Sequence, residues 1–358
     1  MKIFDIRRHV AAQRAEIDAA VARVLDSAQF VLGVELQAFE REFAAAFGMT
    51  HAVGVASGTD AVHLALRACG IGPGDRVGVP ALTFFATAEA VLHAGATPVV
   101  IDVDPRTATM SPDALAGADV RAAIPVHLYG HPADMDAIGS ACALVIEDAC
   151  QAHGARYKQR FAGTMGAAAA FSFYPTKNLS GAGDGGMVAT RDPAVADRVR
   201  LLRHHGQATK DVHEEVGYTS RLDDLQAAIL RVRLRHLDAT TKARRQVAAW
   251  YRDALAGLAL ELPHEAEWAE HVWHLYVIRA DPGARDRIVE GLRARDIAAT
   301  VHYPVPLSRQ PALARLGLTL PPCPVAERIV TSQITLPMDP AMTAADVDAV
   351  AAALKELV

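Results

Sequence analysis

Short apolar runs that carry Val and Ile alternate with helical patterns through the first half of the chain. The runs are AVGVAS, RVGVP, TPVVIDV, AAIPVHLY and ALVIEDA, and the stretches between them include TDAVHLALRAC and TAEAVLHAG. Strands that are apolar at almost every position are buried on both faces, which is typical of a mostly parallel sheet covered by helices on each side. The sequence therefore predicts an α/β fold with such a sheet in a large domain.

The pattern changes after SRLDDLQAAILRVRLRHLDATTKARRQVAAWYRDALAG, which predicts one long helix. Fewer strands follow: WHLYVIR and AATVHYP are separated by a helical pattern around residues 285–295, and Thr343 can cap a final amphipathic helix. We expect a large cofactor-binding domain over residues 1–235 and a smaller α+β domain over residues 236–358. The amino-terminal segment could pack on the small domain.

Composition and charge exclude several classes of protein. The formal net charge is -5 and no run of basic residues occurs, so neither nucleic acid nor an anionic membrane is an expected partner. Charged residues interrupt the amino-terminal segment, which predicts a cytoplasmic protein without a signal peptide. The four cysteines lack C-x-x-C spacing, so neither a disulfide framework nor a metal site is expected.

Residues 171–186, FSFYPTKNLSGAGDGG, contain two competing signals. Gly181, Gly183 and Gly186 have the G-x-G-x-x-G spacing of a dinucleotide-binding loop, whereas Lys177 could present a reactive amine. A dinucleotide loop opens a helix, but these glycines run into MVAT, a strand-like segment, and no suitable acidic residue follows about 20 residues on. We therefore interpret the glycines as a turn between two strands.

Another segment that could belong to the same site as Lys177 is a strand that ends in hydroxyl and glycine residues. In VASGTDAVHLAL an apolar strand ends at Ser57, Gly58 and Thr59, and a helix begins at once. Hydroxyl groups and free helix N–H groups then meet at one point, which fits either a phosphate-binding loop or a simple helix cap.

Acidic and aromatic residues follow at two further strand ends. Glu147 and Asp148 lie at the carboxyl end of ALVIEDA, where α/β sheets bind ligands, and one of the two is expected to point into the crevice. A carboxylate there could cap the next turn or pair with a protonated pyridine nitrogen. Phe84 or Phe85 could pack in the core or stack on a flat ring. Together with Lys177, these features describe a binding site for pyridoxal phosphate.

The order of these segments is similar to that of a known family. The chain resembles the DegT/DnrJ/EryC1/StrS family of fold-type-I, pyridoxal-phosphate-dependent sugar aminotransferases. The resemblance extends over nearly the whole chain and includes HAVGVASGTDAVHLAL, IEDACQAHGA, FSFYPTKNL, GDGGMVAT, SRLDDLQAAIL and HYPVPL. It implies the fold-type-I architecture of a large domain with a mostly parallel sheet and a smaller α+β carboxyl-terminal domain.

The resemblance also implies which residues bind the cofactor phosphate and which form the covalent bond. Lys177 would hold the cofactor as a Schiff base, and a lysine kept from water beside a cationic ring loses proton affinity, so it can act as nucleophile and then as base. Ser172 would bind the phosphate together with Ser57, Gly58 and Thr59.

Other positions would contact the ring or the partner subunit. By resemblance, Asp148 pairs with the pyridine nitrogen and joins Lys177 as a catalytic residue, Gln151 lies near the ring hydroxyl and Phe84 stacks on the ring. Family members form homodimers with shared active sites. Thr219 and Arg221 in GYTSRLDDLQAA would accordingly reach the partner's cofactor phosphate. Arg221 could equally bind the donor carboxylate or form an ordinary ion pair at a helix start.

Three positions depart from the pattern that is common in the family. Thr219 replaces an Asn, Ser308 replaces a His and Asp184 replaces the Glu of GEGG. The first change removes an amide from the cross-subunit contact, and the second removes a possible contact to the sugar or the amino donor. GDGG resembles members that act on carbon 3 of the sugar.

The expected activity is transfer of the amino group of L-glutamate to a nucleotide-linked keto sugar, with a 3-keto sugar favoured. Pyridoxamine phosphate would be the intermediate form of the cofactor. A dehydratase branch of the family has His in place of the lysine, so Lys177 favours transamination. Two alternatives are an aminotransferase for a cyclitol ketone such as scyllo-inosose and a noncatalytic pyridoxal-phosphate-binding regulator. The lack of a basic patch and of an additional helix-turn-helix segment disfavours the regulator.

Overall fold

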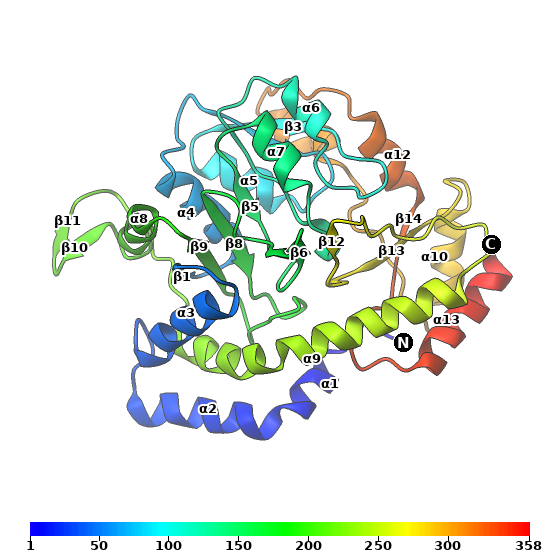
Figure 1. Cartoon of the computed structure of the whole chain (residues 1–358), viewed down its shortest axis with the longest axis horizontal. Helices are drawn as coiled ribbons and strands as arrows, with labels where there is room; N and C mark the ends of the chain where they lie inside the picture. The colour runs from blue at the N-terminus through cyan, green and yellow to red at the C-terminus, as the bar shows by residue number, and fades with distance from the viewer.

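A central sheet with helices on both faces organises the large domain (Figure 1). The structure, a computed structural model, describes all 358 residues. The strands are β1 His51–Val55, β2 Arg76–Pro80, β3 Thr97–Ile101, β4 Ala122–Ala123, β5 Ile146–Asp148, β6 Arg156–Tyr157, β7 Arg160–Phe161, β8 Ala168–Ser172, β9 Gly186–Thr190, β10 Gln207–Thr209, β11 Val212–His213, β12 Ala269–Glu270, β13 Tyr276–Arg279 and β14 Gln333–Leu336. The α-helices are α1 Ile6–Ala12, α2 Arg14–Ser27, α3 Val34–Ala46, α4 Gly58–Ala68, α5 Ala86–His93, α6 Pro112–Ala116, α7 Met135–Ala141, α8 Pro193–Arg203, α9 Asp224–Ala254, α10 Arg285–Arg293, α11 Pro311–Arg315, α12 Pro324–Ser332 and α13 Ala344–Leu357, and the 3₁₀ helices are η1 Leu128–Gly130 and η2 Leu307–Arg309.

The strands of the central sheet are mostly parallel. A four-stranded part in the order β1-β9-β8-β5 meets a three-stranded part in the order β3-β2-β4. Parallel bridges from Ala123 to Val145 and from Val126 to Asp148 join the two parts. Only β9 runs against its neighbours, β1 and β8. The predicted mostly parallel sheet and the predicted glycine turn, which connects β8 to β9, are confirmed.

Alternate residues of each strand face two different apolar cores. Ala168 and Ala170 of β8 pack in a core with α4, α5 and α8, whereas Ala169 and Phe171 pack in another core with α3 and the first half of α9. Because side chains alternate in direction along a strand, these helices cover opposite faces of the sheet. This two-sided burial explains why the strands are apolar at nearly every position.

The long helix α9 connects the large and small parts of the chain (Figure 1). It packs on α2 and α3 and also on α13, so the predicted boundary after residue 235 falls inside one continuous helix. In the small part, β13 pairs antiparallel with β14, and a separate core joins α10, α13 and the end of α9. None of the helices combines the length and the apolar character needed to cross a membrane.

The segment AATVHYP differs from its prediction as a strand. It makes a single bridge, between Thr300 and Thr335. Side chains take the carbonyl groups that a strand ladder would use, since the Tyr129 hydroxyl donates to His302 O and the Gln333 amide donates to Tyr303 O. The small sheet is therefore formed by β13 and β14.

Segments from each predicted domain pack against the other domain. Met338 N donates to the carbonyl of Ile3 and Ala298 N donates to that of Met1, so the amino terminus packs on the small part. Conversely, Leu313 of α11 and Ile329 of α12 belong to the large apolar core on the α4 face. The large apolar core thus contains residues from both halves of the sequence.

Candidate active site

The amino terminus of α4 lies against the start of β9. The Ser57 hydroxyl caps α4 by accepting a hydrogen bond from Asp60 N over 3.1 Å. A Cβ at Gly186 would lie 2.2 Å from the carbonyl oxygen of Ser57, and a Cβ at Gly58 would lie 2.6 Å from Cβ of Ser172. Glycine at these two positions therefore brings the free N–H groups of the helix start and the Ser172 hydroxyl to one point, which suits a phosphate.

The two acids of β5 have different partners. Glu147 is fully buried and accepts hydrogen bonds from His127 Nε2 and from backbone N–H groups. Asp148 accepts one hydrogen bond at each oxygen, from Cys150 N over 3.2 Å and from Thr87 Oγ1 over 3.0 Å. Each Asp148 oxygen therefore keeps a lone pair for a ligand, and of the two acids Asp148 is the one that can face the crevice.

Lys177 is a partly buried lysine whose ammonium group has no partner. Its backbone N–H closes a turn onto Tyr174 O over 2.8 Å, but Nζ makes no hydrogen bond and no ion pair. Burial lowers the pKa of Lys177, and the nearby Cys150 and Asp148 only partly oppose this effect. An amine that is unpaired and easily deprotonated can act as a nucleophile.

Three histidines near Lys177 are kept neutral. Burial, assisted by the lysine charge, lowers the pKa of His153 to about 3 and that of His302 to about 4. The same two causes hold the pKa of His274 well below its ordinary value. These imidazoles therefore add no positive charge around Lys177 at neutral pH.

A group of aromatic and amide side chains, formed by Phe84, Tyr303 and Gln151, lies near Asp148. Phe84 is 56% exposed, and its ring centroid lies 5.6 Å from that of Tyr303. Gln151 is buried, accepts from Tyr129 N over 2.7 Å and donates from Nε2 to the Tyr303 hydroxyl over 3.0 Å. The second N–H of the Gln151 amide has no partner among these residues, so it can donate to a ligand oxygen.

The remaining predicted residues are more dispersed. Thr59 lies in the first turn of α4, but its hydroxyl makes no hydrogen bond. Thr219 is exposed and lies 3.3 Å from the ring of His205, and Arg221 Nη1 lies 3.2 Å from His204 Nδ1. Neither Thr219 nor Arg221 bonds to a predicted ligand of its own subunit. Ser308, the second departure from the family pattern, has a buried hydroxyl without a partner.

Sequence analysis did not identify Thr87 as part of this site. It is buried in the first turn of α5, where it donates to Asp148, and its hydroxyl is also 3.0 Å from that of Thr83. The available signal was a pair of hydroxyl residues four positions apart, one just before the helix and one in its first turn.

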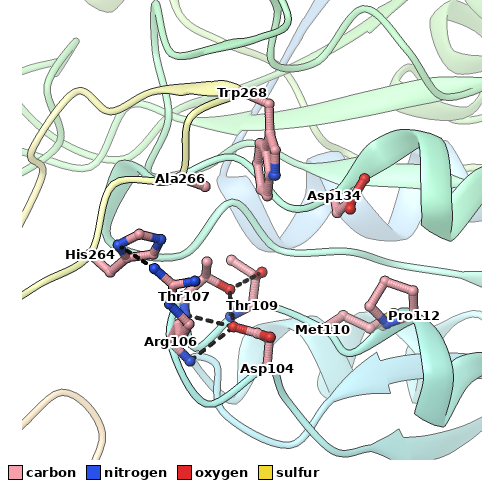
Figure 2. Close-up of a pocket in the computed structure, with 10 residues that line it drawn as sticks. All are labelled: Asp104, Arg106, Thr107, Thr109, Met110, Pro112, Asp134, His264, Ala266 and Trp268. Carbon is pink, nitrogen blue, oxygen red and sulfur yellow. Dashed lines mark hydrogen bonds between the residues drawn. The ribbon is translucent and has the colours of Figure 1, made fainter.

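A separate hollow lies outside the candidate site (Figure 2). Its volume is about 200 Å³, and Trp268 forms one wall. Its polar groups contact one another: Arg106 Nη2 lies 3.3 Å from His264 Nδ1, and Asp104 accepts from Thr107. None of the residues predicted to bind the cofactor lines this hollow.

The chain is similar to known proteins over almost its whole length. The model of the DegT/DnrJ/EryC1/StrS aminotransferase family matches residues 11–355. The dTDP-3-amino-3,4,6-trideoxy-alpha-D-glucose transaminase of Streptomyces venezuelae is 47% identical over 344 residues, which cover 94% of this chain and 90% of that protein. The UDP-N-acetyl-3-dehydro-alpha-D-glucosamine 3-aminotransferase of Acidithiobacillus ferrooxidans is 45% identical, with coverage of 94% and 92%.

Solved structures give the same result for the fold. The crystal structure of S. venezuelae DesV in complex with a ketimine intermediate has a TM-score of 0.95 and 46% identity, and the match covers 99% of this chain and 97% of that one. Structures of the putative sugar aminotransferase Spr1654 from Streptococcus pneumoniae in its PMP form and its PLP form have TM-scores of 0.91 and 0.90. The predicted fold-type-I architecture and pyridoxal phosphate dependence are confirmed.

Proposed function

The chain belongs to the DegT/DnrJ/EryC1/StrS aminotransferase family, and we propose that it transfers the amino group of L-glutamate to carbon 3 of a nucleotide-linked keto sugar. The observation that carries the proposal is the unpaired Lys177 amine beside Asp148. Relatives with 47% and 45% identity are named as enzymes of 3-amino or 3-dehydro sugars, one linked to dTDP and the other to UDP. These names support carbon 3 as the position that receives the amine.

The residues present fit pyridoxal phosphate. Ser57, Gly58 and Thr59 at the start of α4 would bind the phosphate together with Ser172, because free N–H groups and hydroxyls converge there. Phe84 would stack on the ring, since more than half of its side chain lies outside the protein core. The free N–H of the Gln151 amide would bind the ring hydroxyl oxygen.

Two side chains would perform the proton chemistry. The bound cofactor supplies an aldehyde that takes up amino groups and a ring that withdraws electrons. Lys177 would hold the cofactor covalently and, once displaced by the amino donor, carry a proton away from the donor's α-carbon. Asp148 would keep a proton at the pyridine nitrogen, using the lone pairs that Thr87 and Cys150 leave free. The same groups would act in reverse on the keto sugar.

The active unit would be a homodimer. Thr219 and Arg221 make no bond to the cofactor ligands of their own subunit, which fits a role at the partner's phosphate. The apolar side chains of Phe30, Val31 and Val34 are all exposed, as expected for a surface that a second copy covers. The four cysteines are free thiols, which suits a reducing compartment such as the cytoplasm.

Absorption spectroscopy tests this proposal directly. The protein loaded with pyridoxal phosphate should be yellow, and L-glutamate should bleach the visible band as 2-oxoglutarate is released. Lys177→Ala should abolish both effects, whereas Lys355→Ala, which changes an exposed lysine, should alter neither. A band that L-glutamate leaves unchanged would reject glutamate as the donor.

The acceptor is tested with the glutamate-bleached enzyme. Nucleotide-linked 3-keto sugars should restore the visible band, and dTDP and UDP forms should be compared. Scyllo-inosose serves as the competing acceptor, and a faster return of the band with this cyclitol would overturn the assignment to nucleotide sugars.

A further inference from the structure

Three buried side chains form a hydrogen-bonded chain that ends at Asp148. Thr83 Oγ1 lies 3.0 Å from Thr87 Oγ1, which in turn lies 3.0 Å from Asp148 Oδ2. Thr83 precedes α5 and Thr87 lies in its first turn, so the chain connects the start of this helix to the end of β5. Thr87 and Asp148 are 61 positions apart in the sequence.

The direction of the protons in this chain follows from the chemistry of hydroxyl groups. A threonine hydroxyl has one proton to donate and two lone pairs to accept with. Thr87 donates its proton to Asp148, so the bond between the two threonines requires Thr83 to be the donor. Thr83 thereby fixes the rotation of the Thr87 hydroxyl and keeps its proton directed at the carboxylate.

The two oxygens of Asp148 are held from different elements. Oδ1 accepts from Cys150 N in the loop that follows β5, and Oδ2 accepts from Thr87 in α5. The nearby Cys150 thiol donates to Ala170 O over 3.7 Å, so the Thr87 hydroxyl is the side-chain group that holds this carboxylate. Loss of the Thr87 hydroxyl would leave a single contact, about which the carboxylate could rotate.

We propose that Thr87 is a positioning residue that orients the Asp148 carboxylate toward the pyridine nitrogen of the cofactor. The inference rests on the proposed role of Asp148. Removing the hydroxyl should weaken pyridoxal phosphate binding by about tenfold, because a hydrogen bond to a charged group is lost and its acceptor remains buried. The pH midpoint of the visible band of the loaded enzyme should also rise. A pyridine nitrogen that holds its proton less firmly withdraws less electron density from the bond between the cofactor and Lys177, so the group at that bond keeps its own proton to higher pH.

Three substitutions separate the hydroxyl from the volume of the side chain. Thr87→Val keeps the shape and removes the hydroxyl, whereas Thr87→Ser keeps the hydroxyl and removes a methyl group. Thr83→Val removes only the donor to Thr87, so its effect should have the same sign and be smaller. The measurements are the dissociation constant of pyridoxal phosphate from the apoenzyme, the pH titration of the visible band, and the melting temperature of the apoenzyme.

The expected result is a higher dissociation constant and a shifted titration in Thr87→Val, with near wild-type values in Thr87→Ser. A merely structural role would lower the melting temperature and leave the titration unchanged, and that outcome would overturn the inference. If Thr87→Val does not fold, Thr87→Ala takes its place with the same expectation.

Asp148→Asn distinguishes this inference from the proposal on which it rests. If Asp148→Asn binds the cofactor and titrates like the wild type, the proposed role of Asp148 fails and the inference fails with it. If Asp148→Asn is impaired while Thr87→Val is not, only the positioning role of Thr87 is rejected.

Discussion

His127 donates a hydrogen bond from Nε2 to the carboxylate of Glu147 over 2.9 Å, and both side chains are fully buried. Nδ1 of the same ring accepts from Ala133 N over 3.0 Å, so a neutral imidazole satisfies both contacts. Three backbone N–H groups in the loop between β7 and β8 also donate to the carboxylate, those of Gly163, Met165 and Gly166. Glu147 therefore fastens the end of β5, where Asp148 lies, to two neighbouring segments.

Replacing Glu147 with Gln should destabilise the protein strongly. The amide presents N–H groups where the carboxylate accepted hydrogen bonds, so at least one buried donor is left unpaired, at a cost of about 2–3 kcal/mol. Urea unfolding measures the loss. Glu267→Gln is the matched control, because Glu267 is exposed and its change should stay within about 0.5 kcal/mol. Equal stability of the two variants would contradict a structural role for Glu147.

The contribution of Glu147 to stability should disappear in acid. Burial alone raises its pKa, but the hydrogen bonds from His127, Gly166 and Gly163 bring the pKa below its ordinary value of 4.5. A carboxyl whose pKa is lower in the folded state stabilises the fold above its unfolded pKa and loses this contribution as the pH falls through the folded value. The difference in unfolding free energy between wild type and Glu147→Gln should therefore be largest at neutral pH and shrink below about pH 4.5. A difference that is constant across this range would show that the fold does not lower the pKa of Glu147.

The strand pattern alone predicts the layers of this fold but does not distinguish Glu147 from Asp148, a choice that rested on the family resemblance. Strands that are apolar on both faces indicate a covered, mostly parallel sheet. For the same reason the sequence does not indicate to which face each side chain points, because polar and apolar residues do not alternate along these strands. By strand pattern Glu147 and Asp148 were therefore equivalent, and the resemblance selected Asp148. Their contacts with His127 and Thr87 give the physical difference between them.

The contacts that sequence analysis missed are those between distant segments. Thr87 meets Asp148 only because α5 begins beside the end of β5, an arrangement that no local pattern encodes. AATVHYP has the composition of a strand, but side chains from Tyr129 and Gln333 take its carbonyl groups. Local propensity was overridden by tertiary hydrogen bonds in this segment.

Gly58→Ala should weaken cofactor binding without unfolding the protein. The new Cβ would lie 2.6 Å from Cβ and 3.0 Å from Oγ of Ser172, so the serine must move away from the start of α4. We expect the dissociation constant of pyridoxal phosphate to rise by about tenfold or more, as for the loss of a hydrogen bond to a charged phosphate. Gly139→Ala in α7 is the control, because nothing lies within 4 Å of its added Cβ. If both variants bind the cofactor equally well, Ser172 and Gly58 do not form the phosphate site.

The rate at which the apoenzyme captures pyridoxal phosphate should rise with pH and level off below the ordinary lysine pKa of 10.5. Capture requires the free amine of Lys177, and burial lowers the pKa of its ammonium form. A lower pKa means that more of the amine is deprotonated at any given pH, so the rising limb moves to lower pH. Stopped-flow absorbance of the visible band gives the midpoint. A midpoint at or above 10.5 would mean that the fold does not activate this lysine.

Mixing inactive variants should reveal whether two subunits share each active site. Arg221 lies against His204 and bonds to no cofactor ligand of its own chain. We therefore expect each active site to combine Lys177 of one subunit with Arg221 of the other. In a mixed dimer, one site then receives both defects and the other receives none. Random exchange of equal amounts should restore up to about a quarter of wild-type activity, because half of the dimers are mixed and each has one intact site.

The control for this experiment is a mixture of Lys177→Ala with Asp148→Asn. Both residues belong to the site of their own subunit, as the effect of Asp148 on the Lys177 pKa indicates. Every site of such a mixed dimer keeps one of the two defects, so no activity should return. Recovery in the first mixture and not in the second requires that Arg221 crosses to the partner. If neither mixture recovers although size measurements show that subunits have exchanged, Arg221 acts within its own subunit or not in the site at all.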